Sequence, residues 1–343
     1  MIGLVVKIFS DFFYVKTPQG EVFESKVREI LKKSQVSILV GDNVKLEEIS
    51  YNPNQAAISE LLPRKNFIIR PAVANIDKVI IVSSIKNPEF DYIQMNRYLC
   101  FAKWHGIEPI ICINKNDLEP NDQTKNQIKN IYQKLGYQVL FVSAKEKQGI
   151  EEFISAINNQ ICVLCGQSGV GKSSLINAIL PSLNLKVGDI SQKTSRGTHT
   201  TRHSELIEIS LDEVHFYIAD TPGFSNLKFN EVPSSKIVEL FDEINDLSKW
   251  CKYNDCLHID EDGCHVLNNL DKISDFQYES YQMFLKEAQM GEELSKKMSL
   301  KVQEKIKISG GKKLLKISAK NRENSRKKAR QNLNKLDIED LDE

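Results

Sequence analysis

Short apolar segments separated by turn residues fill the first 66 residues of the chain. Their spacing predicts strands rather than helices. The intervening segments Thr17–Gly20 and Gly41–Asn43 carry the residue types that favour tight turns. Strands are expected at Leu4–Phe9, Phe12–Lys16, Val36–Leu39 and Asn43–Glu48. About five strands in so short a segment predict a small closed β-barrel, of which the OB-fold is one option.

From about residue 75 the pattern changes to apolar runs that alternate with segments of helical spacing. This alternation predicts a parallel sheet covered by helices. The expected strands are Asp77–Val82, Pro109–Ile113, Gln138–Val142 and Ile161–Leu164, with an adjacent hairpin at 203–209 and 214–219. Beyond Pro233 the chain becomes helical and is interrupted by a Cys/His-rich loop at 251–265.

A complete phosphate-binding loop lies between the strand Ile161–Leu164 and a predicted helix at Ser174–Leu180. Its residues are Gly166, Gln167, Ser168, Gly169, Val170, Gly171, Lys172 and Ser173, followed by Ser174. Glycines let backbone N–H groups curl around phosphates, and the helix N-terminus adds favourable partial charge. We expect Lys172 to reach the β- and γ-phosphates and the Ser173 hydroxyl to ligate Mg²⁺.

Two other loops indicate which base the nucleotide carries. They follow predicted strands and consist of Asn114, Lys115, Asn116 and Asp117, and of Ser143, Ala144 and Lys145. The Asp117 carboxylate can accept two hydrogen bonds from guanine, and Asn114 can address the other edge of the base. Adenine lacks the matching donors, so it would leave the carboxylate unpaired. Lys115 would lie along the base and the Ala144 N–H would contact the guanine oxygen, which favours GTP and GDP as ligands.

The segment Asp220–Gly223 reads Asp-Thr-Pro-Gly and follows the apolar strand at 214–219. A carboxylate at Asp220 can hold Mg²⁺, usually through water, and the Gly223 N–H can face the γ-phosphate. Asp-x-x-Gly alone is common in turns, but its place after the phosphate loop and the hairpin gives it this specific interpretation.

The polar segment 193–203 lacks periodicity and lies where a GTPase needs a switch loop. Thr200 or Thr201 is expected to bind Mg²⁺ there; spacing does not choose, and we favour Thr200. Phe224 stands where many GTPases carry a water-orienting glutamine, and an apolar side chain cannot orient water. The resulting hypothesis is that His199 positions the attacking water. The alternative is that His199 is a solvent-exposed loop residue or contacts RNA.

Three cysteines and a histidine gather in the polar segment 251–264, namely Cys251, Cys256, His258 and Cys264. Three thiolates and an imidazole suit tetrahedral zinc, and four protein ligands imply a closed, structural site. His265 is a competing candidate. The other four cysteines, Cys100, Cys112, Cys162 and Cys165, lie in apolar elements and are expected to pack in the core.

The formal charge of the whole chain is zero, with 46 Lys and Arg against 46 Asp and Glu, but the C-terminal segment is basic. Between Lys301 and Lys335 there are 13 Lys and Arg against two Glu, which indicates either a polyanionic partner or a solvated tail. No stretch approaches the roughly 18 apolar residues of a membrane span. Seven cysteines without disulfide-scaffold density are consistent with a reducing cytoplasm.

In ordinary GTPases the phosphate loop precedes the guanine loops, whereas here it follows them, so the order is circularly permuted. The chain resembles the ribosome small subunit-dependent GTPase A (RsgA) family in this order and in four motifs. These are Gly-Gln-Ser-Gly-Val-Gly-Lys-Ser-Ser, Gly-Thr-His-Thr-Thr, Asp-Thr-Pro-Gly-Phe and the Cys/His spacing. The resemblance covers residues 1 to about 300. Thr198 departs from it, because the family more usually has Arg or Gln before His-Thr-Thr.

The resemblance implies a multidomain chain that hydrolyses GTP in late maturation of the small (30S) ribosomal subunit, binds rRNA and is stimulated by that subunit. The expected divisions are an OB-fold barrel (1–66), a circularly permuted α/β P-loop GTPase domain (67–230), a helical zinc-binding domain (231–300) and a basic extension (301–343). A monomer is the default expectation. Two alternatives remain: a permuted GTPase acting on the large ribosomal subunit, and an RNA-binding module with structural GTP.

Overall fold

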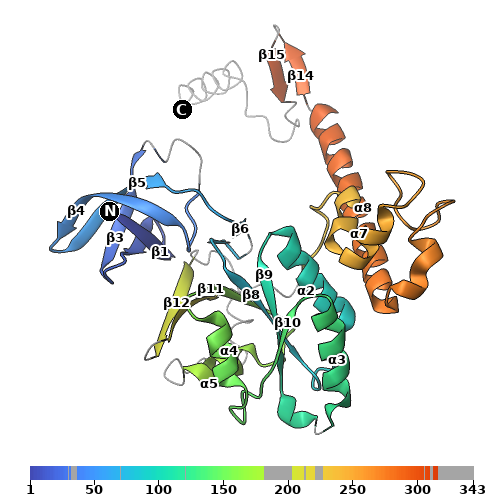
Figure 1. Cartoon of the computed structure of the whole chain (residues 1–343). Helices are drawn as coiled ribbons and strands as arrows, with labels where there is room; N and C mark the ends of the chain where they lie inside the picture. Colours follow the sequence, from blue (N-terminus) through green and yellow to red (C-terminus); the bar gives the residue numbers. More distant parts are fainter. Residues whose placement is uncertain are drawn as a thin grey trace, which may run out of the picture. The chain divides into compact units, whose positions relative to one another are not determined.

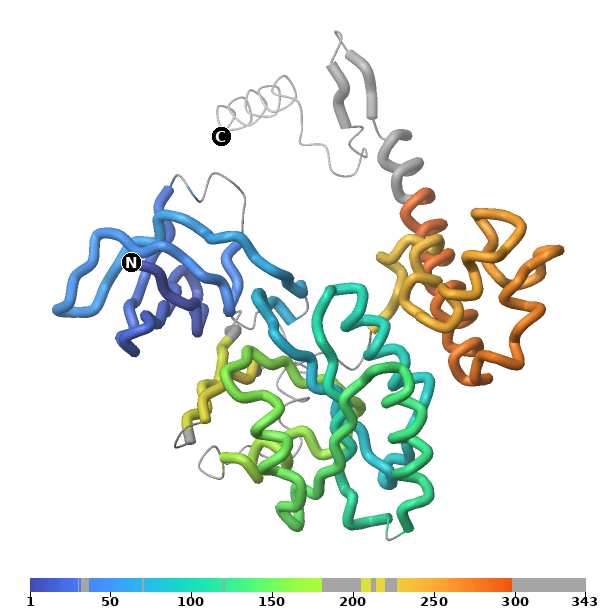
Figure 2. Tube along the Cα trace, viewed as in Figure 1, coloured from blue at the N-terminus to red at the C-terminus, as the bar shows by residue number. Residues whose placement is uncertain are grey.

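The computed structural model describes the residues 1–29, 31, 37–69, 71–119, 121–180, 203–211, 214–220, 227–304, 306–309 and 312–315. The chain clusters into two compact units, one formed by Met1–Lys228 with Ser235–Phe284 and the other by Phe229–Ser234 with Leu285–Glu343. Figures 1 and 2 colour the chain from blue at the N-terminus to red near the C-terminus. None of the helices in the described part of the chain has the length and apolar character needed to cross a membrane.

The N-terminal part is a closed five-stranded barrel, drawn in blue in Figure 1. Its strands are β1 (Ile2–Phe9), β2 (Phe12–Lys16), β3 (Val22–Val27), β4 (Asn43–Tyr51) and β5 (Asn54–Leu61). They pair in the order β1-β2-β3-β5-β4, and β4 returns to β1, while β3 and β5 run parallel. Alternate side chains fill the interior, namely Val5, Val15, Phe23, Val44, Leu46 and Ile58. This closure confirms the OB-fold expectation.

The strand expected at Val36–Leu39 was wrong. Residues 37–39 belong to no regular element, and Val36 lies outside the described residues. The backbone N–H of Leu39 donates to Asp42 Oδ2 (2.7 Å), and the N–H of Asp42 donates back to the Leu39 carbonyl (3.2 Å). A turn therefore takes the hydrogen bonds that a strand ladder would have needed.

The central sheet carries the predicted parallel strands in the order β10-β9-β8-β11-β13, with β12 antiparallel to β13. The strands are β8 (Lys78–Ser84), β9 (Glu108–Asn114), β10 (Gln138–Phe141), β11 (Ile161–Cys165), β12 (His203–Leu211) and β13 (Val214–Asp220). The helices are α2 (Tyr92–Trp104), α3 (Asp122–Lys134), α4 (Ile150–Ile157) and α5 (Lys172–Ile179), with a 3₁₀ turn at Asn116–Leu118.

Two apolar cores cover the two faces of this sheet because successive strand residues point to opposite sides. Val79 and Ile81 pack with α2 and α3, whereas Ile80 and Val82 pack with α4 and α5. Strands buried on both faces need continuous apolar runs, which explains why the sequence shows them without alternation.

Backbone and side-chain hydrogen bonds connect the barrel to the sheet. Strand β1 pairs with β12, so both belong to one extended sheet. A short hairpin, β6 (Phe67–Ile68) with β7 (Val73–Ala74), follows the barrel. After it, Asn75 is buried, donates to the Gly41 carbonyl (2.8 Å) and accepts from the Lys65 N–H (3.0 Å). A Cβ on Gly41 would lie 2.1 Å from the Ala74 carbonyl oxygen, so only glycine allows this close approach.

The C-terminal part is mainly helical. Its elements are 3₁₀ turns at Ser234–Lys236 (η3), Val238–Leu240 (η4) and Leu267–Lys272 (η5), helices α7 (Asp242–Ser248) and α8 (Asp275–Glu304), and a hairpin of β14 (Ile306–Ser309) and β15 (Lys312–Leu315). The Cys/His-rich loop lies between α7 and η5, as expected. Most of the basic extension lies outside the described residues.

Candidate nucleotide site and Cys3His cluster

The loops predicted to bind nucleotide leave the same edge of the sheet. The Asn114 loop follows β9, the Ser143 loop follows β10, and the phosphate loop follows β11. These strands are parallel, and only β8 separates β9 from β11. The carboxyl ends of parallel strands meet at one edge, where ligands of open α/β sheets bind.

Glycines shape the phosphate loop. Gly166 has φ +142°, and a Cβ there would lie 2.0 Å from the Val82 carbonyl oxygen. Gly171 has φ +94° and immediately precedes α5, and a Cβ there would lie 2.3 Å from the Asn114 amide nitrogen. Both positions therefore exclude any other residue on steric grounds. Gly169 also has a positive φ, and Ser168 and Gly169 are exposed, whereas Val170 is buried in the core beside α4 and α5.

Lys172 begins α5 and folds back over the phosphate loop. Its Nζ donates to the carbonyl oxygens of Gly166 and Gln167, each at 2.8 Å. Burial lowers the pKa of Lys172 from its usual value, because desolvation disfavours the charged ammonium. An anion in this loop would favour the charged form and oppose this shift. Ser173 is buried in the first turn of the same helix, and Ser174 is half-buried.

The side chain of Asn114 connects all three loops. It is 2% exposed; its Nδ2 donates to the Val170 carbonyl (2.9 Å) and its Oδ1 accepts from the Ala144 N–H (3.0 Å). The Ala144 N–H was expected to contact guanine, and here it faces Asn114. One amide thus fixes the spacing between the phosphate loop and the two guanine loops.

Asp117 is held in place by the second guanine loop. The Ser143 hydroxyl donates to Asp117 Oδ1 (2.5 Å) and accepts from the Glu146 N–H (3.1 Å). The Asn116 N–H donates to the Val142 carbonyl (3.0 Å). The side-chain Oδ1 of Asn116 is buried and has no hydrogen-bond partner within the described part of the chain.

Lys115 has a left-handed backbone (φ +61°) that turns its side chain across two other loops. Its Nζ donates to the Gly169 carbonyl (2.7 Å) and to the Asn87 carbonyl. Lys145, in contrast, is exposed and pairs with its neighbour Glu146. Lys115 therefore connects its own loop to the phosphate loop and to the loop at Asn87, and its predicted place along the guanine base stays a prediction.

Several predicted site residues lie wholly or partly outside the described residues. Asp220 ends β13, which places its backbone beside β11, but its side chain is outside the described set. His199, Thr200, Thr201, Gly223 and Phe224 lie outside the described residues.

Sequence reasoning missed the contacts of Gln167 and Asn87. Gln167 Nε2 donates to Asp91 Oδ2 (3.3 Å), and Asp91 also caps α2 by accepting from the Gln94 N–H through Oδ1 (2.9 Å). An Asp before a helical pattern is a recognisable N-cap signal. No local signal indicates that the same carboxylate contacts a loop 76 residues later.

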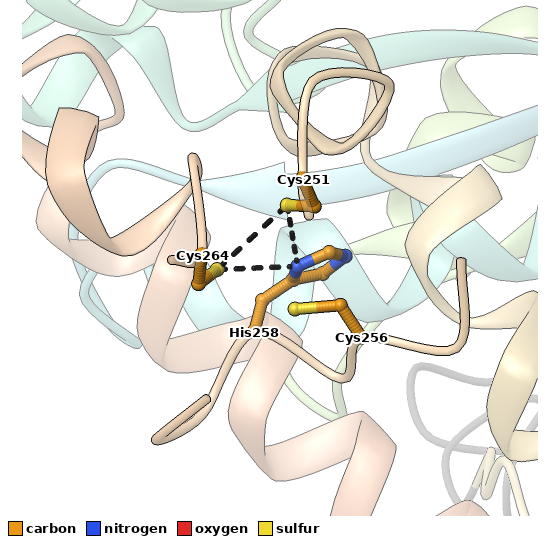
Figure 3. Close-up of side chains that lie close together, drawn as sticks. All are labelled: Cys251, Cys256, His258 and Cys264. Carbon is orange, nitrogen blue, oxygen red and sulfur yellow. Dashed lines mark hydrogen bonds between the residues drawn. The ribbon is translucent and has the colours of Figure 1, made fainter. Parts of the chain in front are cut away.

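The four predicted zinc ligands converge on one point (Figure 3). Their donor atoms all lie within 4.8 Å of one another. His258 Nδ1 lies 3.6 Å from Cys251 Sγ and 3.5 Å from Cys264 Sγ, and the two sulfurs are 3.8 Å apart. Tetrahedral zinc with Zn–S near 2.3 Å and Zn–N near 2.0 Å requires separations of about this size. The donor set therefore fits a structural zinc ion.

Surrounding residues hold the ligand loop in shape. The hydroxyls of Tyr278 and Tyr281 donate to the carbonyls of His258 and Leu257, each at 2.7 Å. The Glu261 carboxylate accepts from the N–H groups of Leu257 (2.6 Å) and Ile259 (2.9 Å). These bonds accommodate the left-handed backbone of His258 (φ +59°).

His265 and the other cysteines do not join this cluster. The His265 side chain is outside the group of converging donors in the described chain. The remaining thiols are buried, and burial raises the pKa of each well above the usual range, as expected for packing cysteines: Cys100, Cys112, Cys162 and Cys165.

Comparisons with known proteins agree with this geometry. The family model described as RsgA N-terminal domain matches residues 2–58, and that described as RsgA GTPase matches residues 61–230. The small ribosomal subunit biogenesis GTPase RsgA of Bacillus cereus is 38% identical over 289 residues, covering 83% of this chain and 96% of the relative. The protein of that name from Clostridium acetobutylicum is 41% identical over 266 residues, covering 78% and 89%.

Solved structures give the same result. The crystal structure of YjeQ from Thermotoga maritima matches with a TM-score of 0.71 and 33% identity, covering 84% of this chain and 98% of that one. That of YloQ, described as a circularly permuted GTPase, matches with a TM-score of 0.68 and 31% identity, covering 84% and 94%. The chain therefore belongs to the RsgA family of circularly permuted GTPases.

Proposed function

We propose that this chain hydrolyses GTP as a switch in late maturation of the small ribosomal subunit. The observation that carries the proposal is the hydrogen-bonded joining of the Asn114, Ser143 and phosphate loops at one edge of a parallel sheet. The relatives from Bacillus cereus and Clostridium acetobutylicum, which are small ribosomal subunit biogenesis GTPases by name, support the choice of the small over the large subunit.

Guanine recognition rests on Asp117 and Asn114. The Asp117 carboxylate, oriented by the Ser143 hydroxyl, accepts from guanine N1–H and from the exocyclic amine. Asn114 addresses the opposite edge of the base, and Lys115 lies along it while its ammonium braces the loops. The Ala144 N–H, which bonds to Asn114 Oδ1 in this structure, serves the guanine oxygen when the nucleotide is bound, and Asn116 and Lys145 complete the two loops. An adenine would offer no donors to the half-buried Asp117 carboxylate, which discriminates strongly against ATP.

Hydrolysis rests on positioning and charge. Backbone N–H groups of the phosphate loop and the start of α5 surround the phosphates, and Lys172 neutralises charge on the transferring phosphoryl group. Ser173, Asp220 and Thr200 hold Mg²⁺, which when bound offsets developing negative charge. The Gly223 N–H faces the γ-phosphate, and His199 positions the attacking water.

The Cys3His cluster holds one structural Zn²⁺, which fixes the loop between α7 and η5. The barrel, the zinc-bearing region and the basic extension contact rRNA mainly through phosphates, so binding weakens as salt rises. The protein acts as a monomer in the cytoplasm, where ribosomal subunits are assembled.

The test is GTP hydrolysis by purified protein alone, with small subunits and with large subunits, using Lys172→Ala as the inactive control. We expect strong stimulation by small subunits only. Stimulation by large subunits instead would mean that the GTPase acts on the large ribosomal subunit. Equal rates in all three reactions would remove the ribosome from the proposal and leave the interpretation as an RNA-binding module with structural GTP. A His199→Ala variant that keeps the full stimulated rate would remove His199 from the mechanism.

A further inference from the structure

The loop between β8 and α2, residues 85–91, leaves the sheet between the phosphate loop and the first of the two guanine loops. Strand β8 pairs with β9 on one side and with β11 on the other. The register places Ser84 beside Asn114 of the first guanine loop, and Ile81 beside Cys165, which directly precedes the phosphate loop. The loop after β8 contains none of the nucleotide-binding motifs in the sequence. Its position nevertheless brings it into contact with both neighbours.

Lys86 connects this loop to the first guanine loop. Its Nζ pairs with Glu119 Oε2 at 2.9 Å. Glu119 is buried and follows Asp117 by two residues. The Asn87 carbonyl adds a second contact by accepting from Lys115 Nζ. Two consecutive residues thus hold the first guanine loop both before and after Asp117.

The ion pair keeps Glu119 charged and in place. The hydrogen bond from Lys86 holds the pKa of the Glu119 carboxyl below its usual value. The Glu119 backbone N–H donates to the Asn116 carbonyl (3.4 Å) at the end of the 3₁₀ turn Asn116–Leu118. Asp117 lies in the middle of that turn. The position of Glu119 therefore influences the position of the carboxylate that is proposed to bind guanine.

The loop after β8 is itself fixed to the phosphate loop. Asp91 Oδ2 accepts from Gln167 Nε2 (3.3 Å), while Asp91 Oδ1 caps α2. Pro88 lies close to Gly169, since a Cβ on that glycine would be 3.9 Å from Pro88 Cδ. The hydroxyl of the buried Ser84 donates to the Pro88 carbonyl (2.8 Å), which fixes the proline relative to β8. This loop is thus anchored to β8, to α2 and to the phosphate loop.

These contacts bear on how a nucleotide leaves the proposed site. The phosphate loop holds one end of the bound nucleotide, and the guanine loops hold the other. Release requires the loops to move apart or to change shape, and contacts that hold them in the bound arrangement raise the free energy of that change. Such contacts slow release and raise affinity even where they do not touch the ligand.

We propose that Lys86 is a positioning residue of the guanine-nucleotide site. Through Glu119 it ties the first guanine loop to a segment that is fixed to the phosphate loop, and this tie slows the release of GDP and GTP. Because the tie acts on the loops and not on the γ-phosphate, its loss leaves the hydrolysis step unchanged. The inference rests on the proposed function for nucleotide binding alone, and it adds a residue outside the recognised motifs.

The sheet offers a matched control in Lys78 and Glu108. Lys78 Nζ pairs with Glu108 Oε1 at 2.7 Å, and the two residues are register partners on β8 and β9. The two ion pairs therefore join the same two strands or the segments that follow them. In each pair one side chain is largely buried and the other is exposed. Lys78 and Glu108 lie at the amino ends of their strands, at the edge opposite the nucleotide loops.

The test measures the release of fluorescent GDP, and of a fluorescent non-hydrolysable GTP analogue, from the purified full-length protein by stopped flow. We expect Lys86→Met to raise both release rates by about three- to tenfold, as loss of an ion pair with one buried partner predicts. Lys86→Arg keeps the cation, so it should stay within about twofold of wild type, as should Lys78→Met. Single-turnover hydrolysis of bound GTP by Lys86→Met should also stay within about twofold of wild type.

Wild-type release rates in Lys86→Met would overturn the inference. Equal acceleration in Lys78→Met would also overturn it, because the effect would then be a general loosening of the sheet. Glu119→Gln removes the charge from the other partner and keeps its shape. The double variant of Lys86→Met and Glu119→Gln should release nucleotide no faster than the faster single variant, and additive acceleration would contradict action through this pair.

The measurement uses no ribosomes, so its outcome is separable from that of the proposed function. A lack of stimulation by small subunits would count against the proposed function alone. Normal nucleotide binding by wild type, with unchanged release from Lys86→Met, would refute the role of Lys86 alone. Wild type that binds neither nucleotide would refute both.

Discussion

The side-chain amide of Asn114 donates a hydrogen bond to the carbonyl oxygen of Val170 across 2.9 Å, although the two residues are 56 positions apart. The same side chain accepts from the Ala144 N–H. Circular permutation reverses the order of these loops along the chain but leaves their contact intact, because the contact depends on the adjacency of strands and not on chain order.

Replacing Asn114 with alanine removes two intramolecular hydrogen bonds and one contact to guanine. Each hydrogen bond contributes about 1 kcal/mol, so GTP and GDP affinity should fall by roughly 10- to 100-fold. Isothermal titration calorimetry measures this directly. Asn121→Ala is the matched control, since Asn121 is exposed in the next loop and its side chain does not cap α3. Affinity within about threefold of wild type would contradict the role given to Asn114.

Asp117→Asn should exchange the base preference of the site. An amide can donate to the xanthine oxygen but cannot accept both guanine donors, so GTP affinity should fall by about 100-fold or more while xanthosine triphosphate gains affinity. Competition binding with the two nucleotides measures the exchange. Asp122→Asn, an exposed change five residues later, is the control and should bind GTP as wild type does. Unchanged GTP affinity in Asp117→Asn would remove this loop from base recognition.

The sequence predicted the site better where the chemistry is local. The phosphate loop requires glycines at Gly166 and Gly171 because their Cβ atoms would collide with Val82 and Asn114, so the motif and its fold imply each other. The Cys3His cluster was predictable for the same reason, since four ligands lie within 14 residues. The contact of Asp91 with Gln167 was not, because it depends on how far α2 lies from β11 in three dimensions.

The barrel shows the same difference between features that the local sequence predicts and contacts between distant residues that it does not. Apolar alternation predicted β1 and β2, but the strand-like residues Val36–Leu39 were also predicted to form a strand, and Leu39 instead forms a turn with Asp42. Asp42 is fully buried and meets Arg64, 22 residues later, through a bidentate ion pair. A pairing partner at that distance has no sequence signature, so local propensity gave the wrong element.

Removing one member of the Asp42–Arg64 pair should be costly. The Arg64 Nε and Nη2 donate to the two carboxylate oxygens at 2.6 and 2.7 Å, and Arg64 also donates to the Ser37 carbonyl (2.6 Å). Arg64→Met leaves a buried carboxylate without its cation, which typically costs about 3–5 kcal/mol. Urea unfolding measures the change. Arg28→Met breaks more exposed pairs with Glu47 and Glu48 and should cost at most about 1 kcal/mol, and equal losses in the two variants would refute this argument.

Loss of one Cys ligand should release the metal. We expect wild type to contain one zinc per chain and Cys251→Ser to retain little, with a fall in Tm of the order of 10 °C. Plasma emission spectrometry and thermal unfolding give the two values. His265→Ala is the control, because His265 follows Cys264 directly and stays outside the cluster. Equal metal loss in the control would mean that His265 is a ligand after all, and metal-free wild type of full stability would exclude a structural role.

Glu243 lies at a small cavity between α2 and α7, and its Oε2 is buried without a hydrogen-bond partner in the described part of the chain. Burial, together with the nearby Asp242, raises the pKa of Glu243 above its usual value. Ionising this carboxyl is therefore less favourable in the folded than in the unfolded chain, so the penalty is present above the folded pKa and disappears as the pH falls below the unfolded pKa. Glu243→Gln keeps the shape without the charge and should raise Tm by the order of a degree at pH 8, with the gain shrinking toward pH 5.

The control for this pH dependence is Glu239→Gln, one turn earlier, where an exposed carboxylate pairs with Lys236. Removing that exposed pair should change Tm little at any pH, because such pairs contribute between about 0 and 1 kcal/mol. Thermal unfolding from pH 5 to pH 8 separates the two variants. A Glu243→Gln variant that is less stable than wild type at pH 8 would mean that the carboxylate has a favourable partner in solution, and a gain that grows as the pH falls would contradict the direction of the pKa shift.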